Sequence, residues 1–246
     1  MRIVASIEAR MTSSRLPGKV MMTAGGRPML AILIERLKQV REIDEIVLAT
    51  TVNSNDEVLE GTARDCGASV FRGSEDDVLG RVCGAINQAR ADVVVEITAD
   101  CPLTDPKMVS FCIREYQRTA DANKYIANTT GSQLGAPAGL DVQVFSADAL
   151  RAIEREVHDL AAREHVSLPF YSGPGVTRWK PRFLSFFSAD VCNKVSVTLD
   201  YAEDYALIKA AYESLSPRDR FFGAERLVEF CLQNPAMTSA CLRQRE

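Results

Sequence analysis

The sequence predicts an α/β protein with a doubly wound, mostly parallel sheet, in a single domain over residues 1–246. Three observations favour this fold class. Short runs rich in β-branched residues alternate with amphipathic helical patterns, polar loops follow these runs, and no repeat, low-complexity tract or clear linker divides the chain. Strands and helices that alternate through right-handed crossovers form such a sheet.

The first half of the chain alternates regularly between strand and helix patterns. Strands are predicted from Ile3 to Ile7 and at residues 45–50, 68–71 and 92–98, and helices at residues 29–43, 56–66, 78–91 and 106–119. Pro28 suits the first turn of the first helix, and Ser54 or Asn55 can cap the second. Gly67 fits the end of that second helix.

The pattern loosens in the second half. Strands are predicted at residues 125–128, 140–145 and 195–199, helices at 147–165 (one or two), 202–215 and 223–234, and an alternating apolar stretch at 179–187. Residues 129–139 are rich in Thr, Gly, Ser and Pro, which favours a mobile loop over a site.

Composition argues against several classes of protein. A net charge of −4 and a hydrophobic content of 46% fit neither a disordered tail nor a strongly basic nucleic-acid surface. The seven cysteines contain no C-x-x-C pair and are odd in number, which argues against a complete disulfide framework and fits a reducing cytoplasm. No apolar run has the length of a membrane span, and the N-terminus does not read as a signal peptide. We therefore expect a cytoplasmic protein without a nucleic-acid or membrane partner.

A basic loop follows the first strand and predicts a phosphate-binding site. Arg10, Arg15 and Lys19 lie on one short segment with the hydroxyl of Ser14, and a Pro-Gly turn ends it. Fork-shaped and point cations together suit a triphosphate. A solvated basic loop is the alternative. The Walker loop and the G-x-G-x-x-G fingerprint are both absent.

Two aspartates follow apolar strand patterns and form a candidate metal site. Asp100 and Asp200 would both lie at the carboxyl edge of the sheet, where open α/β sheets bind ligands. A pair of carboxylates completed by a nucleotide and water is sufficient for Mg²⁺. For either residue alone, a helix N-cap is the alternative.

The basic loop carries a recognisable signature. The segment from Ala9 to Lys19, Ala-Arg-Met-Thr-Ser-Ser-Arg-Leu-Pro-Gly-Lys, resembles the A-R-x-x-S-x-R-L-P-G-K signature of the CMP-sugar synthetases, which activate acidic sugars such as KDO and sialic acids. Within this group, the spore coat polysaccharide biosynthesis cytidylyltransferases are the most similar. Further matching segments are Gly-Ser-Glu-Asp-Asp-Val-Leu at 73–79, Asp-Cys-Pro-Leu at 100–103, Gly-Leu-Asp-Val at 139–142, Arg-Glu-His-Val at 163–166 and Val-Thr-Leu-Asp at 197–200.

The resemblance implies a fold, a reaction and a partner. The fold would be that of the nucleotide-diphospho-sugar transferases, with an insertion at about residues 129–190 that forms dimer contacts and the sugar pocket. A hydroxyl of an acidic sugar, such as a nonulosonic acid or a KDO-like sugar, would attack the α-phosphorus of CTP and give a CMP-sugar and pyrophosphate, for surface polysaccharide biosynthesis. Mg²⁺ would be the cofactor, and a homodimer is expected.

The resemblance also assigns roles to residues. The catalytic residues would be Arg10, Lys19, Asp100 and Asp200, of which the two aspartates would bind the metal. The nucleotide would contact Ala9, Arg10, Ser14, Arg15, Lys19, Arg72, Gly73 and Asp77, and the acceptor would contact Asp141 and His165. Two alternatives remain open, because Asp77 could be part of an ordinary helix start and Asp141 could be a strand-edge carboxylate.

Other functions and roles remain open at this stage. A cytidylyltransferase for a phosphate or phosphonate acceptor would share the nucleotide half, and a catalytically silent sugar-nucleotide binding protein is a further alternative. A glycosyltransferase would commonly carry an Asp-x-Asp motif, and no two aspartates stand two apart. The aromatic residues of the alternating stretch favour a dimer interface, although such residues also fill domain cores; they are Trp179, Phe183, Phe186 and Phe187.

Overall fold

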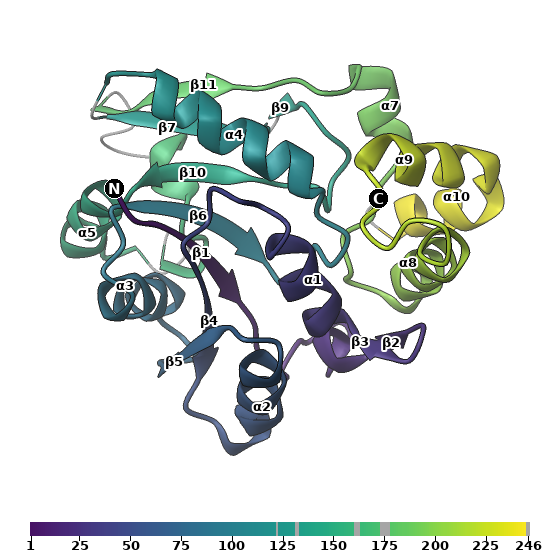
Figure 1. The fold of residues 1–246 in the computed structure, drawn as a ribbon, viewed down its shortest axis with the longest axis horizontal. Coiled ribbons are helices and arrows are strands. Elements are labelled where there is room, and N and C mark those ends of the chain that lie inside the picture. The colour runs from purple at the N-terminus through teal and green to yellow at the C-terminus, as the bar shows by residue number, and fades with distance from the viewer. Residues whose placement is uncertain (122, 131–132, 160–162, 173–177, 245–246) are drawn as a thin grey trace.

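The first strand, β1 (Ile3–Glu8), lies near the centre of a seven-stranded sheet (Figure 1). The structure is a computed structural model that describes residues 1–121, 123–130, 133–159, 163–172 and 178–244. The strand order is β11-β7-β10-β6-β1-β4-β5. The other six strands are β4 (Glu45–Thr51), β5 (Ser69–Gly73), β6 (Val93–Thr98), β7 (Lys124–Ala127), β10 (Gln143–Ser146) and β11 (Lys180–Phe183).

The sheet is mostly parallel. β1 pairs in parallel with β4 and β6, β4 with β5, and β7 with β11, whereas β10 runs antiparallel to both β6 and β7. This confirms the predicted fold class. Strands β10 and β11 both come from residues 129–190, so the expected insertion contributes to the main sheet. The short elements are η1 (Lys19–Met21), β2 (Thr23–Ala24), β3 (Arg27–Pro28), η2 (Ser54–Asp56), β8 (Thr129–Thr130), β9 (Gln133–Leu134), η3 (Leu168–Phe170) and α7 (Ala189–Lys194).

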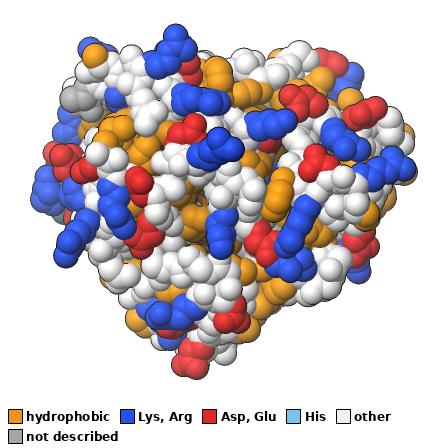
Figure 2. Space-filling view, in the orientation of Figure 1, with side chains coloured by type: hydrophobic (Ala, Val, Ile, Leu, Met, Phe, Trp, Pro, Cys, Tyr) orange, Lys and Arg blue, Asp and Glu red, His pale blue; other side chains and the backbone are white. Residues whose placement is uncertain are grey.

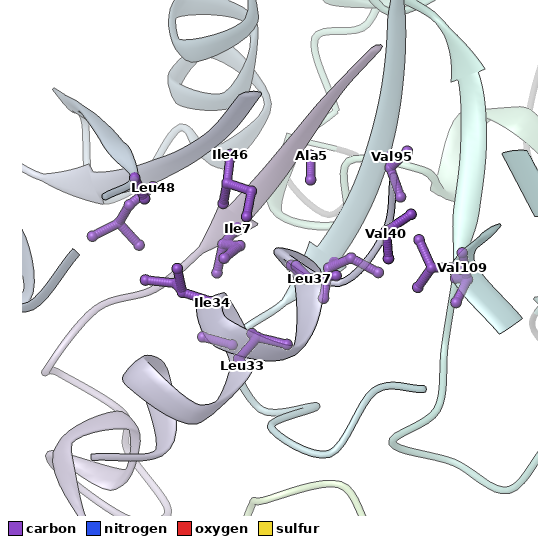
Figure 3. Packing of buried hydrophobic residues seen from close by; sticks show 14 of the residues in the cluster. Ala5, Ile7, Leu33, Ile34, Leu37, Val40, Ile46, Leu48, Val95 and Val109 are labelled. Carbon is purple, nitrogen blue, oxygen red and sulfur yellow. The ribbon is translucent and has the colours of Figure 1, made fainter. Parts of the chain in front are cut away.

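Helices cover both faces of the sheet. One face packs against α1 (Met29–Leu37), α2 (Glu57–Asp65) and α4 (Pro106–Arg118), and the other packs against α3 (Val78–Gln88) and α5 (Ala147–Glu156). Figure 3 shows Leu33, Ile34 and Leu37 of α1 beside Ala5 and Ile7 of β1. Because side chains alternate along a strand, the neighbouring even-numbered positions of β1 face α3 and α5.

The C-terminal helices form a separate group beside α1, away from most of the sheet (Figure 1). They are α8 (Ala202–Leu215), α9 (Ala224–Gln233) and α10 (Pro235–Arg243). Met29 and Ile32 of α1 pack against this group. Arg36, almost fully buried, donates to the carbonyl oxygens of Thr104 at 2.9 Å and Phe222 at 2.7 Å. Arg36 thereby joins the C-terminal helices to the sheet layer.

Several predicted boundaries differ from the structure. Helix α1 ends at Leu37 instead of residue 43, because Val40 turns back into the core. The N-cap of α2 is Asp56 rather than Ser54 or Asn55, which belong to η2. Gly67 ends α2 as predicted, with a positive φ of 79°. Two predictions fall partly outside the described residues, namely the mobility of residues 129–139 and the helix at 147–165. Helix α10 was not predicted.

The predicted strand at residues 195–199 is wrong. The segment is extended, but a single isolated bridge between Ala138 and Ser196 is its only strand pairing among the described residues. Gly139 explains this arrangement. A Cβ at Gly139 would lie 2.3 Å from the carbonyl carbon of Val197, so the two backbones approach more closely than any other residue allows.

The aromatic residues of the alternating stretch are partly core residues. Trp179 is buried, with its ring centroid 4.9 Å from that of Phe170, and Phe186 packs edge-on against Phe111 at 5.5 Å. The dimer therefore remains a prediction that rests on family resemblance. Figure 2 shows positive and negative side chains interspersed over one face of the molecule, as its modest net charge leads us to expect. None of the described helices is long and apolar enough to cross a membrane.

Candidate active site

A pocket of about 250 Å³ opens where β1 and β6 end. The basic loop, the turn after β6, residues 164 and 165 and the start of the C-terminal region all contribute to its lining. Eight predicted site residues line the pocket, namely Ala9, Arg10, Ser14, Arg15, Lys19, Asp100, His165 and Asp200. The structure thus brings together positions that are up to 191 residues apart in the sequence (200 − 9).

Lys19 joins the two candidate metal ligands. Its Nζ lies 2.9 Å from Oδ1 of Asp200 and 3.6 Å from Oδ2 of Asp100. A second cation, Arg15, places Nη1 3.1 Å from Oδ2 of Asp200. Both carboxylates therefore face the same small region, which the cationic groups of Lys19 and Arg15 already occupy.

Local structure holds the two aspartates side by side. The backbone N–H of Leu199 donates to the carbonyl oxygen of Asp100 at 2.8 Å, which ties the two segments directly. The N–H of Asp200 donates to Oδ2 of Asp204 at 3.0 Å, at the capped start of α8. The hydroxyl of Thr98, the last residue of β6, donates to the carboxylate of Asp100. Asp200 is placed by these bonds and not by a strand.

The basic loop is closed by its own backbone. Gly18 has a φ of 72°, and its N–H donates to the carbonyl oxygen of Met11 at 2.9 Å. Arg10 reaches across the pocket mouth, with Nη1 3.7 Å from Oε1 of Glu75 and Nη2 3.7 Å from Oε1 of Glu164. The three cations of the loop all face carboxylates that bound phosphates would have to replace.

Four predicted site residues do not line this pocket. Arg72 donates to the carbonyl oxygens of Thr51 at 2.9 Å and Asn53 at 2.7 Å, so its guanidinium stabilises the end of β4 and the loop that follows. Gly73 ends β5. Contacts between these residues and a nucleotide stay predictions.

Asp77 and Asp141 have structural partners. Asp77 is the N-cap of α3 and accepts from the N–H of Gly80 at 2.9 Å, as its helix-start alternative requires. It also forms a two-point ion pair with Arg163, at 2.9 and 2.7 Å. Asp141 accepts from the N–H of Gly139 at 3.1 Å, and burial raises the pKa of this carboxyl.

Three charged residues of the pocket were not predicted as site residues, namely Glu8, Arg81 and Glu164. Burial raises the pKa of Glu8 from 4.5 to about 8, with Arg81 opposing and Asp100 adding to the rise. Glu8 carried a usable signal, because a charged residue ends an otherwise apolar strand just before the basic loop. Nothing in the sequence marks Arg81, which lies on α3.

The site matches the donor chemistry of a magnesium site with few protein ligands. Within the described parts of the chain, no three His, Cys, Asp or Glu side chains converge on one point. Two carboxylates that share a cation are nevertheless present, and Mg²⁺ commonly takes one or two carboxylates and completes its shell with phosphate oxygens and water.

Comparisons with known proteins agree with this geometry. The chain is 32% identical over 238 residues to the spore coat polysaccharide biosynthesis protein SpsF of Bacillus subtilis, covering 95% of each chain. It is 28% identical over 199 residues to 8-amino-3,8-dideoxy-manno-octulosonate cytidylyltransferase of Shewanella sp., covering 77% of this chain and 79% of the relative. The solved structure of a cytidylyltransferase from Leptospira borgpetersenii superposes with a TM-score of 0.88 at 27% identity, covering 97% of each chain.

The family model described as Cytidylyltransferase matches residues 4–211, which span the sheet, the pocket and most of α8. Both aspartates, the basic loop and the segment that carries His165 fall inside this range. With most of the chain matched, the sequence belongs to the cytidylyltransferase family.

Proposed function

We propose that this enzyme transfers CMP from CTP to an acidic sugar, a nonulosonic acid or a KDO-like sugar, and releases pyrophosphate, for surface polysaccharide biosynthesis. The observation that carries the proposal is the ammonium of Lys19, at the end of the basic loop, within 4 Å of both Asp100 and Asp200. Membership of the cytidylyltransferase family and similarity to a relative named for an amino sugar acid support the reaction and the acceptor class.

Asp100 and Asp200 would hold Mg²⁺ in this proposal. The bound ion would neutralise the reacting phosphate and lower the pKa of the attacking hydroxyl. Both carboxylates already face a shared cation, and the two segments that carry them are tied by a backbone hydrogen bond of 2.8 Å.

The chain's own cations would bind and orient the triphosphate. Lys19 and Arg15 would exchange their carboxylate partners for phosphate oxygens, and Arg10 would leave Glu75 and Glu164 for the same reason. Charge stabilisation and alignment dominate transfers of this type. The free enzyme therefore holds its cations ready in the positions where negative charge would be bound.

The sheet order suggests how the substrates divide the site. Arg72, Gly73 and Asp77 follow or end β5 on one side of β1, and would lie near the nucleotide base. Asp141 lies just before β10, on the other side of β1, and His165 lines the pocket; both would contact the acceptor. We also propose a homodimer in the cytoplasm, on the family resemblance.

Single and double Asp→Asn changes at positions 100 and 200 test the shared site. We expect each single change to lower Mg²⁺-dependent pyrophosphate release by about a hundredfold or more, because each removes one anionic ligand without changing size. The double variant should be little worse than either single variant. Asp190→Asn, on the exposed surface of α7, is the matched control and should keep full activity.

Other outcomes would redirect the proposal. Full activity of either single variant contradicts a shared metal site, and a loss of folding equal to the loss of activity favours a helix-capping role. A nucleotide scan separates the alternative functions. Preference for ATP, GTP or UTP contradicts cytidylyl transfer, whereas turnover only with phosphate or phosphonate acceptors contradicts the acidic sugar.

A further inference from the structure

A polar patch continues the pocket beneath the central strands. The register pairs Ser6 with Glu96 and Glu8 with Thr98 across β1 and β6. All four side chains lie on the face that is covered by α3 and α5, where their neighbours Val4 and Val94 are apolar core residues. Two acids and two hydroxyls thus interrupt a hydrophobic face at the end that reaches the active site.

Three oxygens of this patch are buried without a partner. Within the described residues, no hydrogen-bond partner is found for Oγ of Ser6, Oε1 of Glu8 or Oε2 of Glu96. Glu96 is only 5% exposed. Burying a polar group without a hydrogen bond destabilises the fold, and more so when the group is charged, so such groups are rare. Three neighbouring ones, of which the one on Glu8 belongs to a residue that lines the pocket, indicate a ligand that supplies donors.

The patch is continuous with the active site. Glu8 and Thr98 line the pocket together with His165. The hydroxyl of Ser167, two residues after His165, donates to Glu96, so the segment that carries His165 also covers the patch. β6 lies on the opposite side of β1 from β4 and β5, so Glu96 is on the side that we assign to the acceptor.

The patch also lacks a cation of its own. In the part of the chain that the structure describes, Arg81 is the cation that influences Glu8, and its guanidinium donates to the carbonyl oxygens of Ala49 and Ser74. The polar groups near Glu96 are Glu8, Ser167, Gln143 and the hydroxyls of Tyr125 and Tyr171, and none of these is a cation. An ammonium group offers three donors and a positive charge, which matches three unpartnered oxygens on two acids and a serine.

We propose that Glu8 and Glu96 form a subsite that binds an ammonium group of the acceptor, so that the preferred acceptor is an amino sugar acid. The inference rests on the proposed function and narrows its acceptor class. The acceptor's carboxylate would face the cations of the pocket, while its ammonium group would be buried against the two glutamates. A hydroxyl in place of the amine would supply fewer donors and no charge.

Calorimetry with matched acceptors tests the subsite. The probes are 3-deoxy-octulosonates and nonulosonates, each paired with an analogue in which one hydroxyl is replaced by an amine. We expect the wild-type enzyme to bind at least one amine at least tenfold more tightly than its hydroxyl partner. Glu96→Gln and Glu8→Gln should each remove most of this preference, because each should weaken binding of the amine more than binding of its hydroxyl partner.

Glu115→Gln is the matched control. Glu115 is as buried as Glu96, at 5% exposure, but lies on α4 across the sheet and pairs with Arg182. This variant should retain the amine preference. If it loses the preference as Glu96→Gln does, the effect belongs to general packing and the subsite is wrong.

Three further results would overturn the inference. The first is that the amine and the hydroxyl acceptor of every pair bind equally well. The second is that Glu96→Gln weakens binding of both equally. The third is that the glutamate variants change the preference for CTP over UTP, which would assign the glutamates to the nucleotide base. Turnover of hydroxyl acceptors without amine preference would leave the proposed function intact. Amine preference in binding without pyrophosphate release would overturn the proposed function alone.

Discussion

Lys19 neutralises two carboxylates that would otherwise repel each other. Its side chain is 12% exposed and that of Asp200 is 11% exposed, so their ion pair at 2.9 Å is largely shielded from water. Removing one partner of such a pair leaves an uncompensated charge, which costs far more than a surface ion pair. The free site is thus held in place by the same charges that would bind substrate, and CTP must offer the cations at least equal compensation.

Glu8 makes the stability of the protein depend on pH. Burial raises its pKa to about 8, so the folded chain with no acceptor bound retains a proton that the unfolded chain releases near 4.5. Stability from this proton is complete below about pH 4.5 and is lost as pH rises through 8. We expect Glu8→Gln to reduce the loss of unfolding free energy between pH 5 and 8 by about 3–4 kcal/mol, measured by urea unfolding.

Glu45→Gln is a suitable control, because Glu45 lies at the start of β4, away from the pocket, and has its own partner in Arg2. Its pH profile should follow that of the wild type over this range. Parallel profiles for Glu8→Gln and the wild type would show that Glu8 is ionised in the folded protein at neutral pH.

The strands and helices of the first half could be predicted, whereas the placement of Asp200 could not. β6 has a triple valine that marks a buried strand, and Gly67 ends α2 as expected. The segment before Asp200 has the same apolar pattern but pairs by one bridge only, because Gly139 lets another backbone approach it. Sequence periodicity reports burial, and it does not report which backbone supplies the partner.

The N-terminus of α3 provides a prediction at this scale. Asp77 caps the helix and pairs with Arg163, so Asp77→Ala should lower the unfolding free energy by about 1–2 kcal/mol. Asp77→Asn should retain most of the cap, since asparagine is an equally good N-cap residue. Thermal unfolding measures both. Equal stability of the alanine variant and the wild type would contradict the capping role.

CTP titration of the same two variants addresses the predicted nucleotide contact. If the carboxylate of Asp77 touches the nucleotide, the asparagine variant will bind CTP more weakly despite its intact cap. Unchanged affinity in a stable asparagine variant would leave Asp77 with a structural role alone.

At the scale of the molecule, the alternating pattern predicted a mostly parallel sheet but not its full strand order. β10 runs antiparallel between β6 and β7, and β11 closes one edge. These strands come from the irregular second half, where long connections leave pairing to tertiary contacts. The edge strand β11 carries Lys180, Pro181 and Arg182, all exposed. Proline and charge on an edge oppose pairing with another sheet, so association through β11 is disfavoured.

The predicted homodimer therefore needs another surface, and Phe111 is the natural candidate. Its side chain on α4 is 42% exposed and packs edge-on against Phe186, which places an aromatic pair at the surface. Aromatic residues are enriched at the cores of interfaces.

We expect light scattering at micromolar concentration to give twice the chain mass of 27.1 kDa. Phe111→Glu should shift the protein toward monomer, because it would bury a charge. Leu232→Glu, at a 46% exposed position on α9, is the control and should stay dimeric. A monomeric wild type would contradict the dimer, and a dimer unaffected by Phe111→Glu would place its interface elsewhere.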